Sequence, residues 1–263
     1  MIVVITGGSN GIGKCAVEIL KKQGNEVVNV DIHGGDICAD IGTPAGRAYI
    51  IRELHERYPD GIDGLISNAA IAGIPGQTAA DVLSVNYFGA VTIIEGLFDL
   101  LQKRSGNCAV TCSASISYGQ RTKYVIDDLL VNCEDEERIR EFASQLEQED
   151  HAQMMYVTSK FALARWVRRK SAAWAARGVI INAVAPGGVD TTIIPNMKTG
   201  PLFDVVTMAQ PMPTVYYDRD LMRPESIAKT LAFLVTPEAR GNCGAIVYCD
   251  GGSCALIHPD IYV

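Results

Sequence analysis

The beginning of the chain constrains the fold most, because it joins a short apolar strand pattern to a glycine-rich turn and then to a helical pattern. The apolar residues Met1–Ile5 lead into the glycines between Thr6 and Gly13, and helical periodicity follows in Lys14–Gln23. Glycines let the backbone turn sharply and let a pyrophosphate approach the amide groups at the N-terminus of a helix. The sequence therefore predicts a nucleotide-binding α/β unit at the start of the chain.

A carboxylate directly follows the next predicted strand, Glu26–Val30. Asp31 can accept hydrogen bonds from the adenosine ribose hydroxyls of NAD, whereas it would repel the additional phosphate of NADP. No Arg or Lys follows in Ile32–Gly35 to offset this repulsion. We therefore predict NAD as the cofactor; the alternative is an Asp31 that merely opens a turn. In the short strand or turn Ile37–Ile41, Asp40 could bond the adenine amino group.

Strand and helix patterns alternate along the rest of the chain. This alternation predicts an α/β fold: a single doubly wound Rossmann domain, residues 1–263, with a mostly parallel sheet flanked by helices and ligands at the carboxyl ends of its strands. The further predicted elements are the helices Pro44–Arg57, Thr78–Lys103 and Pro224–Leu234 and the strands Gly64–Ser67, Asn107–Cys112, Val179–Val184 and Ala245–Cys249.

Asn86 lies in the middle of the predicted helix Thr78–Lys103, where asparagine is unfavourable. One interpretation is a side chain that forms hydrogen bonds within the core. The other is a kinked site that holds a water molecule for proton relay. The residues alone leave both open.

Tyr156 and Lys160 are four residues apart in a long helical pattern, so that the phenol and the ammonium lie on one face. A free phenol has a pKa of about 10, and acid/base work near neutrality needs a lower value. A neighbouring cation lowers the pKa of a phenol. The two residues are therefore a candidate proton-transfer pair, although the same spacing also arises by chance.

Several motifs occur together and in order, and they cover nearly the whole chain. In this combination the sequence resembles the short-chain dehydrogenases/reductases, although Ala70 replaces the last glycine of one family motif. The motifs are Thr6-Gly7-xxx-Gly11-x-Gly13, Asn68-Ala69-Ala70, Asn86, a serine after the fifth strand, Tyr156-xxx-Lys160, Pro186-Gly187, Arg223-Pro224-Glu225 and Asp250-Gly251-Gly252.

This resemblance implies a role for each motif. Tyr156 would be the general acid/base, Lys160 would lower its pKa and bond the nicotinamide ribose, and Asn86 would anchor a proton-relay water. Val189 and Thr191 would bond the nicotinamide carboxamide. The implied cofactor site comprises Gly7, Ser9, Asn10, Gly11, Ile12, Gly13, Asp31, Ile32, Asp40, Ile41, Asn68, Ala69, Tyr156, Lys160, Pro186, Gly187, Val189 and Thr191.

The resemblance also implies a catalytic serine that polarises the substrate oxygen. The strand Asn107–Cys112 runs into Ser113-Ala114-Ser115. The family often shows Ala-Ser or Ser-Ser before an apolar residue, with the second position catalytic. This pattern selects Ser115, and Ser113 is the alternative.

Two further segments are predicted to serve the substrate or a partner. The family commonly places its serine much closer to the tyrosine, so residues 118–153 form a helical insertion, with helical periodicity in Lys123–Val131 and Glu134–Glu149. We interpret it as an element for dimer contacts or for the rim of the substrate cleft, and its acidic start, residues 134–137, as a solvated helix N-terminus. Residues 192–222 are predicted to form a substrate lid. Its apolar side chains, which could equally be core or dimer surface, include Ile194, Leu202, Phe203, Met208, Met212 and Tyr216.

Charge and composition argue against several classes of partner. The net charge of -7 argues against nucleic acid or an anionic membrane surface as the main partner. The eight cysteines show no CxxC spacing, so we predict no metal site and a reducing compartment. The N-terminus reads as a strand instead of a signal peptide, and no apolar run is long enough to cross a membrane. We expect a cytoplasmic homo-oligomer, either a dimer or a tetramer.

The insertion, together with residues 84–90, resembles the branch of the family formed by the 3-alpha-hydroxysteroid dehydrogenases/carbonyl reductases. This resemblance implies an enzyme that uses NAD to interconvert a secondary hydroxyl and a ketone on a hydrophobic, steroid-like substrate such as a hydroxysteroid or bile acid. One alternative is a short-chain reductase of a smaller alcohol, a sugar or a xenobiotic carbonyl. A second is a dinucleotide-binding regulator without catalytic activity.

Overall fold

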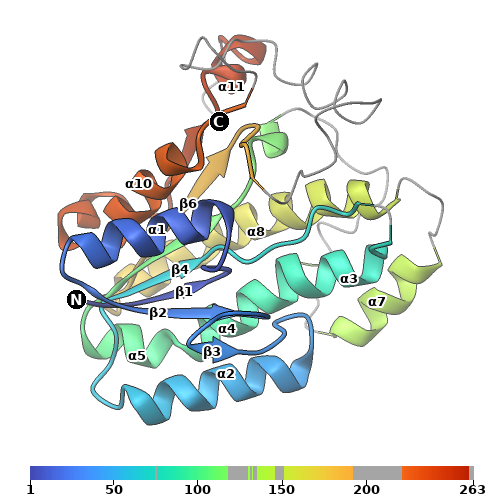
Figure 1. Ribbon diagram of the computed structural model, residues 1–263. Coiled ribbons are helices and arrows are strands. Elements are labelled where there is room, and N and C mark those ends of the chain that lie inside the picture. The colour runs from blue at the N-terminus through green and yellow to red at the C-terminus, as the bar shows by residue number, and fades with distance from the viewer. Residues whose placement is uncertain are drawn as a thin grey trace.

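Seven parallel strands form the centre of the structure, in the order β3-β2-β1-β4-β5-β6-β7 (Figure 1). The computed structural model describes residues 1–74, 76–117, 130, 132, 135–145, 151–191 and 221–260. All adjacent strands pair in parallel. The predicted α/β fold with a doubly wound parallel sheet is therefore confirmed.

The order of elements follows the predicted alternation closely. The strands are β1 (Ile2–Thr6), β2 (Glu26–Asp31), β3 (Ile37–Cys38), β4 (Gly64–Ser67), β5 (Asn107–Thr111), β6 (Ile180–Pro186) and β7 (Ile246–Cys249). The α-helices are α1 (Gly11–Lys22), α2 (Pro44–Arg57), α3 (Ala79–Leu83), α4 (Ala90–Gly96), α5 (Phe98–Lys103), α7 (Glu136–Ser144), α8 (His151–Ala175), α10 (Pro224–Leu234) and α11 (Ser253–Ile257). The described part of the chain also contains a π-helix, η1 (Ser84–Gly89), and two 3-10 helices, η2 (Ala114–Ser117) and η3 (Pro237–Gly241).

Helices cover both faces of the sheet, and two apolar clusters fill the space between the layers. In β1, Val3 and Ile5 pack in the cluster that includes residues of α1 and α10, whereas Val4 packs in the cluster that includes residues of α2, α4 and α8. Figure 1 shows α1 and α10 on one side of the sheet and α2 and α4 on the other. Because side chains alternate along a strand, a continuous apolar run such as β1 is typical of a strand buried on both faces.

The predicted helix Thr78–Lys103 is wrong as a single element, because it is divided into four. It begins as α3, widens into the π-helix η1, continues as α4 and breaks at Leu97 before α5. A π-helical turn accommodates an extra residue and is typical of functional sites. Asn86, at its centre, is fully buried, donates its Nδ2 to the Ile71 carbonyl and accepts the Ile71 amide at Oδ1, both at 2.9 Å. The interpretation of a side chain that forms hydrogen bonds within the core is therefore confirmed. The helix is also distorted at this point, and the proton-relay water stays a prediction.

The insertion contributes one described helix, α7, which is shorter than the predicted Glu134–Glu149. Asp135 caps it by accepting a hydrogen bond from the Arg138 amide. The prediction of a solvated acidic start is wrong for Glu136, whose side chain is only 18% exposed and forms an ion pair with Arg47. Most of the predicted helix Lys123–Val131 lies outside the described residues.

The predicted lid, residues 192–222, also lies outside the described residues except for Leu221 and Met222. Met222 forms an isolated parallel bridge with Val189 and is buried. The six apolar lid residues named from the sequence are not among the described ones. Among the helices of the described part of the chain, none is long and apolar enough to cross a membrane.

Asn182, at the centre of β6, connects the sheet to the segment that precedes β7. Its fully buried side chain donates to the Asn242 carbonyl at 2.8 Å and accepts the Ala245 amide at 2.9 Å. Asn182→Ala leaves both backbone groups without a partner, so we predict a loss of roughly 2–4 kcal/mol in the free energy of unfolding. Asn25→Ala, at a half-buried side chain with a hydrogen bond to the Leu20 carbonyl, should cost less than about 1.5 kcal/mol. Equal losses for the two variants in denaturant titrations would contradict this account.

Candidate active site

A cleft of about 480 Å³ lies at the carboxyl ends of the central strands. Parallel strands end at the same edge of a sheet, and ligands of such folds bind there. Most residues predicted for the cofactor line it, namely Gly7, Asn10, Gly11, Ile12, Asp31, Ile32, Asp40, Ile41, Asn68, Ala69, Tyr156, Lys160, Pro186, Gly187, Val189 and Thr191. The predicted residues that do not line it are Ser9, Gly13, Asn86 and Ser115.

The glycine turn is packed so tightly that side chains cannot replace its glycines. Gly7 has a φ of +72°, and a Cβ there would lie 2.7 Å from the Ala69 Cα. A Cβ on Gly13 would lie 2.0 Å from the Gly7 carbonyl oxygen, which explains how Gly13 shapes the turn without lining the cleft. The turn leads into the N-terminus of α1, where backbone amides and the helix dipole favour an anion.

Asp31 is held in place by backbone amides at the end of β2. Its Oδ2 accepts the Ser9 amide at 2.9 Å, and its Oδ1 accepts the Ile32 amide at 2.7 Å. Ser9 therefore serves the site through its backbone amide, which positions the carboxylate. Ile32 is 54% exposed beside it and offers an apolar surface at the rim of the cleft.

Lys160 is almost completely buried, with 2% of its surface exposed, and reaches from α8 to the end of β5. Its Nζ donates a hydrogen bond of 2.9 Å to the Thr111 carbonyl. Burial lowers the pKa of Lys160 to about 8, and the neighbouring Cys112 thiol opposes this shift. A lysine so placed is costly for stability, which is typical of a functional site.

Tyr156 lies on the same face of α8, and Lys160 Nζ is 5.9 Å from the centroid of its ring. Burial raises the pKa of the Tyr156 phenol, and a hydrogen bond with Ser113 partly offsets this rise. The sequence predicted the opposite direction, with Lys160 lowering this pKa. Desolvation of the phenol is the largest cause of this shift in its pKa.

Ser113 contacts the phenol, whereas Ser115 was the serine predicted from the sequence. Ser115 Oγ instead donates a hydrogen bond of 3.0 Å to Ser113 Oγ. The chain enters the 3-10 helix η2 at Ala114, directly after Ser113, and this turn places Ser115 one hydrogen bond further from the phenol. We therefore revise the serine adjacent to Tyr156 to Ser113.

Asn68 links the glycine turn to β5. Its Nδ2 donates to the Gly7 carbonyl at 3.1 Å, and its Oδ1 accepts the Thr111 hydroxyl at 3.1 Å. The Thr6 hydroxyl accepts the amides of Asn68 and Ala69 at 3.0 and 3.2 Å. A continuous set of hydrogen bonds thus runs from the glycine turn to the end of β5, where the Thr111 carbonyl holds Lys160.

Sequence reasoning missed Thr111 and Cys112, which also line the cleft. Thr111 contributes its backbone carbonyl to Lys160, and a carbonyl leaves no signal in the side-chain pattern. Cys112 is buried beside Lys160, and burial raises the pKa of its thiol to about 12. The position of both at the carboxyl end of β5 is the one signal that could have indicated them.

These residues fit a dinucleotide. The glycines of the turn leave no room for a Cβ, the helix N-terminus follows at once, and a fixed carboxylate ends β2. Within the described residues, no group of three or more His, Cys, Asp or Glu side chains could hold a metal ion.

The lowered pKa of Lys160 predicts a specific pH dependence of stability. In the unfolded chain a lysine has a pKa of about 10.4, so between about pH 8 and pH 10 the unfolded state binds more protons than the folded state. The free energy of unfolding of the wild type should therefore rise relative to Lys160→Met by roughly 1–3 kcal/mol across this window. Denaturant titrations of both proteins measure this difference, and a constant difference would contradict the assignment.

Two family models match the chain in succession. The model described as short chain dehydrogenase matches residues 1–125, and the one described as Enoyl-(Acyl carrier protein) reductase matches residues 141–254. Together they include the glycine turn, the carboxylate after β2 and the Tyr156–Lys160 pair.

Individual proteins are similar to this chain over nearly its full length. A 3-alpha-hydroxysteroid dehydrogenase/carbonyl reductase of Comamonas testosteroni is 29% identical, over 98% of each chain. A coniferyl-alcohol dehydrogenase of a Pseudomonas species is 28% identical, over 95% of each chain. The crystal structure of a 3-alpha-hydroxysteroid dehydrogenase from Pseudomonas sp. B-0831, complexed with NADH, is 28% identical and superposes with a TM-score of 0.90 over 100% of both chains.

The cleft, its glycine turn and the buried lysine thus agree with the similarity that runs along the whole chain. The chain belongs to the short-chain dehydrogenase/reductase family and is an NAD-dependent oxidoreductase.

Proposed function

We propose that the protein interconverts a secondary hydroxyl and a ketone on a hydroxysteroid or bile acid, with Tyr156 as general acid/base. The observation that carries the proposal is the pair formed by Tyr156, which is partly buried, and Lys160, which is buried, in the same cleft as the glycine turn and Asp31. A dinucleotide bound along this cleft has its adenosine end near Asp31 and Asp40 and its nicotinamide end near Tyr156.

NAD, when bound, would supply the hydride acceptor for the carbinol carbon, and the positive charge of its ring would favour the ionised form of a nearby phenol. Tyr156, acting as its phenolate, would take the proton of the substrate hydroxyl and so return to the neutral phenol. Ser113, which already contacts the phenol, donates a hydrogen bond to the substrate oxygen and so stabilises the charge that develops there. Lys160, whose Nζ is 5.9 Å from the centroid of the phenol ring, would bond the nicotinamide ribose. The main chain around Asn86 would anchor a water that returns the proton to solvent.

Asp31 supports NAD over NADP. Its two carboxylate oxygens are fixed by backbone amides of Ser9 and Ile32, so the negative charge cannot turn away from an additional phosphate on the ribose. Val189 and Thr191, which also line the cleft, are proposed to bond the carboxamide.

The steroid assignment rests on similarity to the two 3-alpha-hydroxysteroid dehydrogenases, both of which match this chain over nearly its whole length. The coniferyl-alcohol dehydrogenase relative, nearly as similar, favours a smaller aromatic alcohol as a second candidate substrate.

The substrate is tested by incubating the purified protein with NAD and a panel of 3-hydroxysteroids, bile acids and aromatic alcohols. We expect NADH formation with at least one 3-hydroxysteroid at a kcat/KM above that of coniferyl alcohol. Turnover of the aromatic alcohol alone would remove the steroid assignment and leave the oxidoreductase chemistry intact.

Tyr156→Phe should lower kcat by roughly 100- to 10,000-fold while leaving NAD affinity nearly unchanged, because only the proton-transfer group is removed.

Ser113→Ala should lower kcat by roughly 100- to 1000-fold, and Ser115→Ala, the matched control two residues away, by much less. A larger loss for Ser115→Ala would restore the serine predicted from the sequence.

Asp31→Ala should reduce the preference for NAD over NADP by roughly 10- to 100-fold, because it removes hydrogen bonds to the ribose and the repulsion of the phosphate. The ratio of kcat/KM for the two cofactors measures this preference. A wild-type ratio that already favours NADP would show that Asp31 does not select the cofactor.

A further inference from the structure

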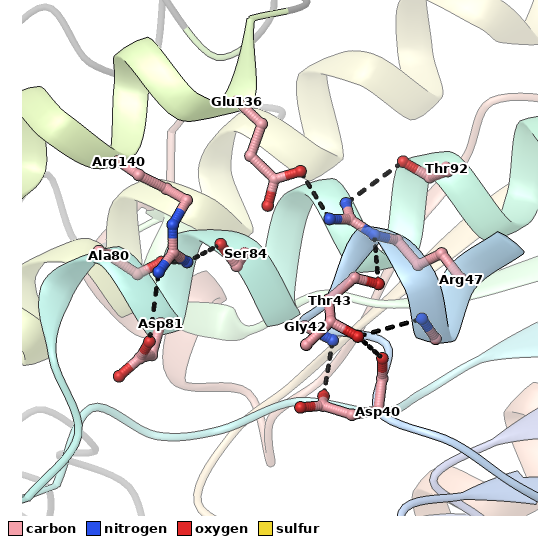
Figure 2. Close-up of polar contacts among 11 residues, drawn as sticks. Asp40, Gly42, Thr43, Arg47, Ala80, Asp81, Ser84, Thr92, Glu136 and Arg140 are labelled. Atoms are coloured by element: carbon pink, nitrogen blue, oxygen red, sulfur yellow. Dashed lines mark hydrogen bonds and ion pairs between the residues drawn. The ribbon is translucent and has the colours of Figure 1, made fainter.

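An ion pair attaches the insertion helix α7 to α2, in the nucleotide-binding half of the fold. Both of its side chains are largely shielded from solvent, unlike those of a typical surface ion pair. Arg47 Nη2 lies 2.6 Å from Glu136 Oε2, and the side chains are 3% and 18% exposed (Figure 2). Arg47 belongs to the first turns of α2, where the helix dipole disfavours a cation. Its burial therefore depends on Glu136, which supplies the compensating charge from α7.

The same pair is poorly explained as a device for stability alone. Glu136 Oε1 is buried and has no hydrogen-bond partner among the described residues. An incompletely satisfied buried carboxylate is expensive, and apolar residues of similar size often stabilise a fold as well or better. Such a pair is typical of side chains that fix the position of one element against another, here α7 against α2.

Arg47 also fixes the loop in front of α2. Its Nε donates to the Thr43 carbonyl at 3.2 Å. Thr43 is in turn bonded to Asp40: its amide donates to the Asp40 carbonyl at 3.2 Å and its hydroxyl to the same oxygen at 3.1 Å. Asp40 Oδ1 accepts the Gly42 amide at 2.7 Å. Figure 2 shows this succession from Glu136 through Arg47 to Asp40.

A second attachment of α7 ends beside the same region. Arg140 donates to the Ala80 carbonyl and to the Ser84 hydroxyl, and its Nη2 lies 3.7 Å from Asp81 Oδ1. Ser84 is followed by Val85, which lines both the cleft that contains Tyr156 and Lys160 and a neighbouring cavity of about 560 Å³ between α7 and the loop at Asp40. The insertion thus borders the wall of the cleft at its adenosine end.

We infer that Arg47 and Glu136 are a positioning pair, which couples the insertion helix to the adenosine end of the cofactor cleft. The inference rests on the placement of adenosine near Asp40 given above. If the pair fixes the loop from Asp40 to Thr43, it strengthens the binding of adenosine. By linkage, bound adenosine in turn stabilises α7. By this inference the insertion contributes to the cofactor site, a role that the sequence did not predict for it.

The test uses AMP, which carries the adenosine end of NAD without its nicotinamide. Glu136→Gln should raise the dissociation constant of AMP at least about fivefold in calorimetry. In the wild type, saturating AMP should slow hydrogen exchange in the peptide that spans residues 135–145, and this protection should be lost in Glu136→Gln. A merely structural role would weaken α7 with and without AMP and leave the AMP-dependent protection in place.

Two further variants make the result unambiguous. Glu56→Gln removes an exposed partner of Arg52 on the same helix α2, and it should change neither the AMP affinity nor the protection of α7. The double variant Arg47→Met with Glu136→Met leaves no unpaired buried charge, so it tests the coupling in a chain that retains its fold; it should show the same loss of AMP affinity.

The outcomes separate the inference from the proposed function. If the wild type binds AMP and Glu136→Gln binds it equally well, or if bound AMP does not protect α7 in the wild type, the coupling is overturned and the cofactor site stands. If the wild type does not bind AMP, the placement of the cofactor itself is wrong, and the coupling falls with it.

Discussion

The parallel register of the sheet is the constraint on which the rest of the structure depends. Because all seven strands run in one direction, the ends of β1, β2, β4 and β5 bring their following residues to a single edge. The glycine turn, Asp31, Asn68 and Thr111 are far apart in sequence and meet there in one cleft. A parallel sheet needs helical crossovers, and these same crossovers supply the helix N-terminus at the turn and the helix that carries Tyr156 and Lys160.

Lys160 shows how this edge combines a structural cost with a chemical role. The ammonium is buried, its pKa is lowered to about 8, and its hydrogen bond goes to the carbonyl at the end of β5. The same strand end is tied through the Thr111 hydroxyl and Asn68 to the glycine turn. A displacement of the glycine turn would therefore move the group that holds Lys160. This connection links the binding of a nucleotide to the geometry of proton transfer.

Sequence reasoning predicted what depends on local pattern and failed where tertiary contacts decide. The strands, α2 and α10 follow from apolar runs and helix signals, and the glycine turn and Asp31 from spacing after strands. A kink at Asn86 was one of two interpretations, but its hydrogen bonds to the backbone of Ile71, 15 residues earlier, leave no signal in the local pattern. Ser115 was chosen from a dipeptide pattern, whereas the turn at Ala114 sets which hydroxyl meets the phenol. Glu136 looked solvated because its partner, Arg47, is distant in sequence.

We propose that Tyr156 transfers the proton and that bound NAD favours the ionised form of its phenol. Burial raises the pKa of this phenol. The most direct measurement is the titration of this phenol by ultraviolet difference absorbance between the wild type and Tyr156→Phe, with and without saturating NAD. The account predicts phenolate formation only above about pH 10 without NAD and at a clearly lower pH with it. A titration of Tyr156 that NAD does not change would contradict the account.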